Sequence, residues 1–265
     1  MLNTDLLLYI DIKGLMDKKQ LYSIHEVMGV PIAALRMSDA VQACVAFMQE
    51  PGVHLVATAN AEMIMLAQRD PELAHVLRDA ELVVPDGAGV LWAGEKLGFR
   101  FPERVTGADL AHELLLQSGM HDWPVYFLGG APGVAEKAAR HFSAQYGDFP
   151  VAGIHDGYFD DIEEARIIKQ IRDSGARLLL VGMGVPKQEK WIYAHKQELG
   201  NLVAVGIGGV FDVMAGNLKR APLWMQKHRL EWAYRLYLQP SRIGRMLAIP
   251  KFMVAVRKWK RETRG

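Results

Sequence analysis

Polar side chains follow short apolar runs of the chain, at positions where they could bind or activate a ligand. Thr58 and Asn60 follow the run 53–57, and Asp86 follows the run 81–84 and precedes a glycine. A carboxylate in such a turn can act as a general base if its pKa suits the step. Asp and Asn in these positions also cap helices, so catalysis and capping both stay open from the pattern alone.

Glycine-rich turns suggest a second kind of chemistry, the binding of a diphosphate. Gly129 and Gly130 stand between an apolar run and a helical pattern, where glycines let the backbone approach phosphates at a helix N-terminus. The string is neither the dinucleotide fingerprint G-x-G-x-x-G nor a Walker sequence. Asp156, about two dozen residues further on, is placed like the ribose-binding acid of NAD folds. An oxidoreductase therefore stays open as an alternative.

Three further side chains could contact an anionic or hydroxylated substrate. Gln188 opens a predicted helix beside a glycine-containing loop. Asp212 follows a turn with three glycines, which a plain tight turn would also explain. Arg104 could pair with a phosphate group. We treat these three as candidate substrate-binding residues.

The sequence predicts no metal ion and no cofactor. It contains no Asp-x-Asp string and no His-x-x-x-His pair, and its one cysteine, Cys44, lies in an apolar helical run that should pack in the core. If the substrate is a nucleotide diphosphate, arginines must supply most of the positive charge that a metal would otherwise bring. Arg235, Arg242 and Arg245 have near-helical spacing and are candidates, although a solvated or lipid-attracting face would have the same pattern.

Short apolar runs alternate with helical patterns along the body of the chain. The predicted strands are 53–57, 81–84, 125–128, 177–181 and 202–205. The predicted helices are 61–78, 87–97, 108–118, 133–146, 161–174 and 187–198. This alternation predicts an α/β fold, a Rossmann-like and mostly parallel sheet with helices on both faces. Ligands bind at the carboxyl ends of the strands in such sheets.

Composition divides the chain into three parts. Half of the 265 residues are hydrophobic, enough for a sizeable core, which we assign to 27–218. Residues 1–26 form an extension without a clear role, and 219–265 form a basic helical appendage rich in aromatic residues. The appendage carries a net charge of +11, and the rest of the chain carries −10. Such a tail predicts a patch for phosphates, anionic lipid or nucleic acid.

The sequence predicts a cytoplasmic protein. No apolar run reaches 18 residues, so we expect no membrane-spanning helix of the usual kind. The N-terminal apolar run lacks the basic flank and small-residue cleavage site of a signal peptide. Aromatic residues of the appendage suit a membrane interface, although core packing explains them equally well.

The order and spacing of several strings together resemble the WecG/TagA/CpsF family of bacterial glycosyltransferases. Each string alone is weak, and the resemblance covers about residues 27–255. The matching strings are 58–62, 85–87, 104–107, 128–130, 155–159, 182–189, 206–212, 220–222 and 230–236.

The resemblance implies an inverting, metal-independent transfer from a UDP-sugar to N-acetylglucosamine on undecaprenyl diphosphate, at the inner face of the membrane. Donors in the family include UDP-N-acetylmannosamine, and the products feed cell-surface polysaccharides such as wall teichoic acid. By the same resemblance, Asp86 is the catalytic base with Thr58 beside it. Arg235, Arg242 and Arg245 are similar to the appendage arginines that close over the donor diphosphate. The motifs do not specify the sugar, and the first 25 residues depart from the family pattern.

Two other classes of function compete with this interpretation. A dehydrogenase on the same core would need a complete dinucleotide fingerprint, which the sequence lacks. A non-catalytic membrane or nucleic-acid binding module would use the basic tail alone, and gives no reason for Asp86 and the glycine-rich turns at strand ends. We therefore expect a UDP-sugar, a polyprenyl-linked acceptor and the membrane surface as partners, and no nucleic acid. The amphipathic appendage could also pack against a second subunit, so a homo-oligomer is compatible with the sequence.

Overall fold

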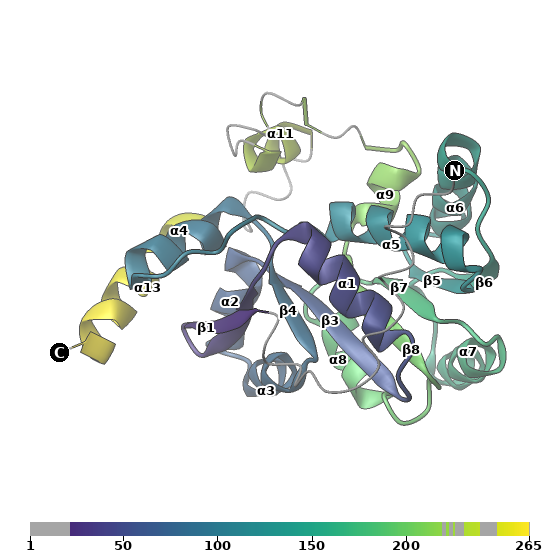
Figure 1. Cartoon of the computed structure of the whole chain (residues 1–265), viewed down its shortest axis with the longest axis horizontal. Helices are drawn as coiled ribbons and strands as arrows, with labels where there is room; N and C mark the ends of the chain where they lie inside the picture. Colours follow the sequence, from purple (N-terminus) through teal and green to yellow (C-terminus); the bar gives the residue numbers. More distant parts are fainter. Residues whose placement is uncertain (1–21, 219–220, 223–224, 226–230, 239–247, 265) are drawn as a thin grey trace, which may run out of the picture.

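A six-stranded sheet with all strands parallel forms the centre of the molecule, in the order β4-β3-β8-β7-β5-β6 (Figure 1). The computed structural model describes residues 22–218, 221–222, 225, 231–238 and 248–264. The strands are β3 (Val53–Ala59), β4 (Leu82–Pro85), β5 (Val125–Gly129), β6 (Val151–His155), β7 (Leu178–Gly182) and β8 (Leu202–Gly206). The predicted α/β class and its parallel sheet are confirmed.

The strands are continuous apolar runs because both faces of the sheet are covered. All seven residues of β3 are buried. Val56 of this strand is aligned with Leu82 of β4 on one side and with Val205 of β8 on the other. This register brings the carboxyl ends of the three strands to the same edge of the sheet.

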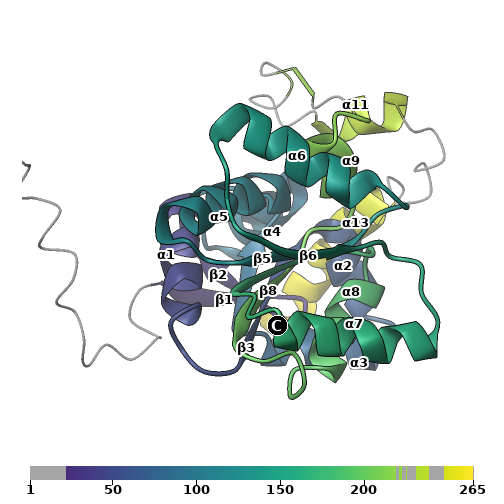
Figure 2. The same cartoon turned by 90° about the vertical axis from the view of Figure 1, so that its right-hand side faces the viewer.

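Helices cover the two faces of the sheet in separate layers (Figure 2). One layer contains α1 (Met37–Phe47), α5 (Gly107–His121), α6 (Val134–Tyr146) and α9 (Val210–Met214). The opposite layer contains α2 (Ala61–Ala67), α3 (Pro71–Asp79), α7 (Asp161–Asp173) and α8 (Lys187–Ala194). Cys44 is fully buried in the first layer, as predicted.

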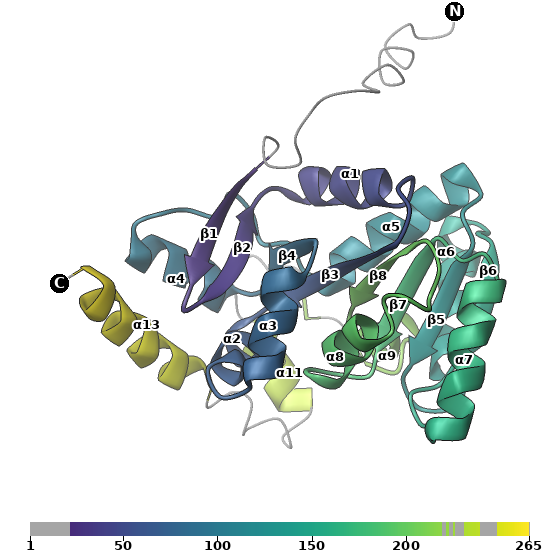
Figure 3. The same cartoon turned by 90° about the horizontal axis from the view of Figure 1, so that it is seen from below.

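The C-terminal helix α13 (Ala248–Arg264) packs on α2 and on α4 (Ala88–Leu97), near the hairpin of β1 (Ser23–Val27) and β2 (Val30–Ala34) (Figure 3). Phe252 and Val256 of α13 are fully buried in the same apolar cluster as α2 and α4. This burial makes α13 part of the packed core, since detaching the helix would expose both side chains to water.

Several boundaries differ from the sequence prediction. The predicted helix 61–78 is two helices, because Asp70 caps a new helix with Pro71 at its first position. The predicted helix 187–198 ends at Ala194. The strand β1 begins at Ser23, four residues before the predicted start of the core.

In the appendage, the structure describes the helices α11 (Glu231–Leu238) and α13. Arg235 lies in α11, but its side chain is outside the described part, and Arg242 and Arg245 lie wholly outside the described residues. Within the described ranges, no helix is both long and apolar enough to cross a membrane.

Candidate active site

Two neighbouring strands at the centre of the site send the chain to opposite faces of the sheet. From β3 the chain continues into α2 on one face, and from β8 it continues into α9 on the other. A crevice outside the carboxyl ends is expected where neighbouring loops diverge in this way, and open α/β sheets bind ligands there. The predicted residues Thr58, Asp86 and Asp212 all lie at this edge.

Asp86 lies where two distant loops meet. Its backbone N–H donates to the carbonyl oxygen of Ala59 at 2.8 Å, which ties the end of β4 to the end of β3. The N–H of Gly107 donates to Oδ2 of Asp86 at 3.3 Å, and the N–H of Val105 donates to the carbonyl of Pro85 at 3.0 Å. The loop that contains Arg104 is thereby held against the end of β4, which brings two of the predicted motifs together.

Thr58 joins this loop to the neighbouring strand. Its buried hydroxyl donates to the carbonyl oxygen of Gly206 at 3.1 Å, across the gap between β3 and β8. A Cβ on Gly107 would lie 3.3 Å from the Thr58 Oγ1, so the two residues are in close contact. We name Thr58, Asp86 and Gly107 the acid cluster.

Asn60 has the structural role that the sequence left open. Its Oδ1 accepts a hydrogen bond from the N–H of Met63 at 3.0 Å and caps α2. Capping does not move it away from the site, because Asn60 directly follows β3. A Cβ on Gly87 would lie 3.9 Å from its Cβ, which places the Asn60 side chain beside the turn that follows Asp86.

Four glycines close the other half of the site, at the ends of β5, β7 and β8. A Cβ on Gly129 would lie 2.5 Å from the carbonyl carbon of Gly182, and one on Gly182 would lie 2.9 Å from the carbonyl oxygen of Gly208. Gly130 has a φ of 73° and donates its N–H to the Gly182 carbonyl at 3.1 Å. We name Gly129, Gly130, Gly182 and Gly208 the glycine cluster. Only glycine, which has no side chain, leaves enough room for the backbones of these loops to pack at these distances.

Gln188 connects two loops of the glycine cluster. Its Oε1 accepts from the N–H of Gly184 at 3.1 Å and from the N–H of Gly208 at 2.9 Å, and its Nε2 donates to Oε1 of Glu189 at 2.7 Å. The side chain is buried. These bonds fix the Gln188 side chain between the loops that follow β7 and β8, and its contact with substrate stays a prediction.

Asp212 and Asp156 lie on either side of the glycine cluster. Asp212 is half-buried in the first turn of α9, and the ring of its neighbour Phe211 packs against Gly182. Asp156 accepts the N–H of Tyr158 at 2.8 Å and shapes its own loop after β6. That bond gives Asp156 a structural role within its own loop.

Burial changes the acidity of two groups near the core. It raises the pKa of Cys44 to about 12, so this thiol stays protonated and is no nucleophile. Burial also raises the pKa of Glu189 to about 7, although the hydrogen bond from Gln188 opposes the shift. Glu189 is fully buried.

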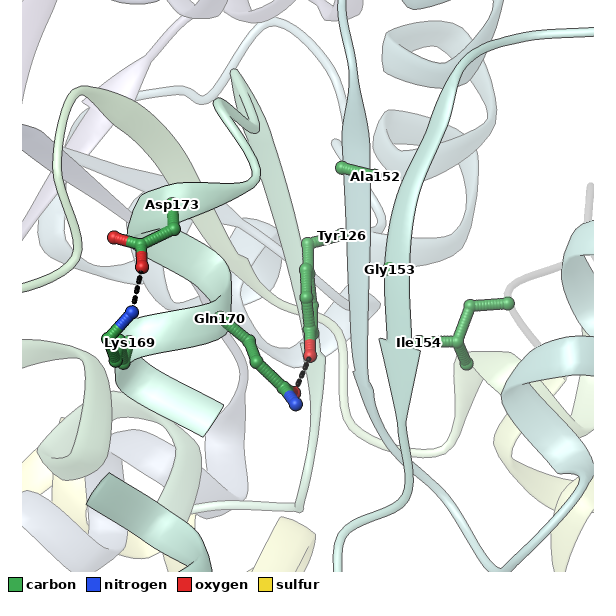
Figure 4. A pocket seen from close by; sticks show the side chains of 7 residues that line it. All are labelled: Tyr126, Ala152, Gly153, Ile154, Lys169, Gln170 and Asp173. Atoms are coloured by element: carbon green, nitrogen blue, oxygen red, sulfur yellow. Dashed lines mark hydrogen bonds and ion pairs between the residues drawn. The ribbon is translucent and has the colours of Figure 1, made fainter. Parts of the chain in front are cut away.

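A shallow cavity of about 390 Å³ lies elsewhere, beside the edge strand β6 (Figure 4). It is lined by Tyr126, Ala152, Gly153, Ile154, Lys169, Gln170 and Asp173. Its polar groups bond to one another: Tyr126 donates to Gln170 at 3.3 Å, and Lys169 pairs with Asp173. None of the predicted site residues lines it, so we place the candidate site at the carboxyl edge of the sheet. The described residues contain no group of three or more His, Cys, Asp or Glu side chains that could hold a metal ion.

The sequence of this chain is similar to those of known proteins. Residues 25–265 match the Glycosyl transferase WecG/TagA/CpsF family. The chain is 35% identical over 204 residues to the N-acetylglucosaminyldiphosphoundecaprenol N-acetyl-beta-D-mannosaminyltransferase of Bacillus subtilis (strain 168). The aligned region covers 77% of this chain and 79% of that protein. Proteins of the same name from Bacillus spizizenii and Staphylococcus aureus (strain NCTC 8325) are 36% and 34% identical over 213 and 207 residues. These matches cover 80% and 78% of this chain, and 82% and 81% of the relatives.

The parallel sheet and the family match together define a glycosyltransferase with an α/β core. The chain belongs to the WecG/TagA/CpsF family, as the sequence motifs suggested.

Proposed function

We propose that this enzyme transfers N-acetylmannosamine, or a related sugar, from a UDP-sugar to N-acetylglucosamine-diphospho-undecaprenol. The reaction would serve the synthesis of a cell-surface polysaccharide of the teichoic acid type. The names of the relatives supply the substrates. The observation that carries the proposal is the Thr58–Gly206 hydrogen bond, which joins the acid cluster to the end of β8, the strand that leads to Gly208 of the glycine cluster. A base and a diphosphate site must be adjacent for this transfer.

Asp86 acts as the general base in this proposal. It takes the proton from the acceptor's 4-hydroxyl while that oxygen attacks C1 of the donor sugar. The bond from C1 to the diphosphate breaks, UDP leaves with the electron pair, and the configuration at C1 inverts. The N–H of Gly107 donates to Oδ2 of Asp86 and so restricts the orientation of the carboxylate.

The charge on the leaving UDP is offset without a metal ion. The N-terminus of α6 lies beside the glycine cluster at the end of β5, where the lack of side chains lets a diphosphate approach closely. Arg104, held beside Asp86, and the appendage residues Arg235, Arg242 and Arg245 add positive charge.

The outer face of α13 docks the enzyme on the inner face of the membrane in this proposal. Lys251, Arg257, Lys258 and Arg261 are exposed on this helix, and Val254 is 64% exposed between them. Basic side chains near an anionic surface contribute about 1 kcal/mol each. The same helix packs on α2 and α4, which begin beside Asn60 and Asp86, so docking would bring the site to the lipid-linked acceptor.

Equilibrium binding of UDP, NAD and an RNA oligonucleotide separates this function from its alternatives. We expect UDP to bind, and Arg104→Met to weaken UDP binding about tenfold because a charge-assisted contact is lost. Arg140→Met, on the exposed surface of α6, is the matched control. Binding of NAD without UDP would support an oxidoreductase, and binding of RNA alone would support a nucleic-acid module; either result would contradict the proposal.

A further inference from the structure

The side-chain amide of Gln188 has one orientation that satisfies its surroundings. Two backbone N–H donors, from Gly184 and Gly208, converge on Oε1, and the Glu189 carboxyl group accepts from Nε2. Exchanging oxygen and nitrogen would set the amide N–H groups against the N–H groups of Gly184 and Gly208 and lose both bonds to the loops. The orientation of the amide therefore decides whether the loops after β7 and β8 are held together.

Packing alone does not explain why Glu189 is buried, because burying its carboxyl group costs free energy. It is fully buried, and its Oε2 has no hydrogen-bond partner among the described residues. A buried acid with an unsatisfied oxygen destabilises a fold, and an apolar side chain of similar size would pack there without this penalty. Its one described side-chain bond, at 2.7 Å, is to Gln188.

The Glu189–Gln188 pair lies directly against the strand that joins the two halves of the site. A Cβ on Gly206 would lie 2.7 Å from Nε2 of Gln188 and 2.8 Å from Oε1 of Glu189. The carbonyl oxygen of Gly206 in turn accepts from the Thr58 hydroxyl. A change in the pair would therefore affect the acid cluster through Gly206. It would affect the glycine cluster through the bond from Gly208 to Gln188.

We propose that Glu189 is a positioning residue, which holds the Gln188 amide so that its oxygen joins the Gly184 and Gly208 loops around the donor diphosphate. Glu189 touches no substrate in this proposal and acts only through Gln188. The effect on catalysis rests on the proposed function, because the diphosphate site is part of it. The effect on the two loops does not.

Glu189→Leu removes the acceptor at nearly constant volume, and Glu189→Gln restores one. Ile192→Val is the matched control, since Ile192 is fully buried in the same helix and belongs to a core cluster. In the full chain, we expect Glu189→Leu to shift the amide NMR resonances of Gly184 and Gly208 and to speed their hydrogen exchange. We expect the donor KM to rise about tenfold, the equivalent of one hydrogen bond, with kcat within about threefold. Glu189→Gln should stay close to wild type.

The amide resonances of Gly184 and Gly208 test the proposal even if the wild type shows no sugar transfer. Unchanged Gly184 and Gly208 amides in Glu189→Leu, or equal changes in Ile192→Val, would overturn it. If Glu189→Leu does not fold, Gln188→Met removes the same connection with Glu189 in place, and unchanged amides in that variant would also overturn it. Shifted amides with an unchanged donor KM would contradict the link to the diphosphate site.

Discussion

The backbones of Gly129 and Gly182 touch so closely that a Cβ on Gly129 would lie 2.5 Å from the carbonyl carbon of Gly182. Gly129 also has a φ of 133°, a conformation that other residues rarely adopt. The ends of β5 and β7 can be adjacent at this distance only while both residues lack side chains.

Gly129→Ala should destabilise the fold by about 3 kcal/mol or more, because the methyl group meets backbone that cannot move aside. Gly175→Ala is the control: Gly175 also has a positive φ, of 68°, but a Cβ there would meet nothing within 4 Å. That change should cost only about 1 kcal/mol. Chemical denaturation of both variants measures the difference, and equal losses would show that the contact with Gly182 is unimportant.

Phe252→Ala should destabilise the protein by about 3–5 kcal/mol. The ring is fully buried and lies 3.8 Å from the position of a Cβ on Gly89 in α4, so its loss leaves a cavity between α13 and the core. Val254→Ala, at a position 64% exposed on the same helix, should change stability by less than about 0.5 kcal/mol. A thermal shift for Phe252→Ala as small as that for Val254→Ala would show that α13 is not part of the core.

The free energy of unfolding should decrease between about pH 4.5 and pH 7 because of the titration of Glu189. The folded protein keeps this proton until about pH 7, whereas the unfolded chain releases it near 4.5. The unfolded state binds fewer protons in that window, so the free energy of unfolding decreases as the pH rises through it.

Glu189→Gln removes this titration. The wild-type free energy of unfolding, measured by denaturation at pH 5 and pH 8, should therefore fall more than that of Glu189→Gln. Parallel changes in the two proteins would mean that Glu189 ionises at its ordinary pKa.

The sequence predicted the sheet where its strands are continuous apolar runs, as in all five predicted strands. It missed β6, because that edge strand is only partly buried and contains Gly153, where the ring of Tyr126 packs. It also missed the β1–β2 hairpin, which flanks the sheet and is not part of it. Local patterns do not reveal elements whose stability comes from contacts with distant parts of the chain.

The meeting of the candidate site residues at one edge of the sheet was predictable from the sequence, and their hydrogen bonds were less so. Parallel strands bring their carboxyl ends to one edge, which is why Thr58 and Asp86 could be placed together from the sequence. The bond from Gly107 to Asp86 joins two separate loops, and no spacing rule indicates it. Gln188 bonds inward to Gly208 because two backbone donors converge on it, which only the folded chain reveals.

The most direct test of the central claim is UDP release from UDP-N-acetylmannosamine with a lipid-diphosphate N-acetylglucosamine acceptor, measured in EDTA for wild type and Asp86→Asn. Removal of a general base typically lowers the rate by about 10²–10⁴-fold. We predict acceptor-dependent release that survives EDTA in the wild type and falls by that factor in Asp86→Asn. Loss of wild-type activity in EDTA would contradict the metal-free mechanism. Undiminished activity of Asp86→Asn would contradict the assignment of Asp86 as the base.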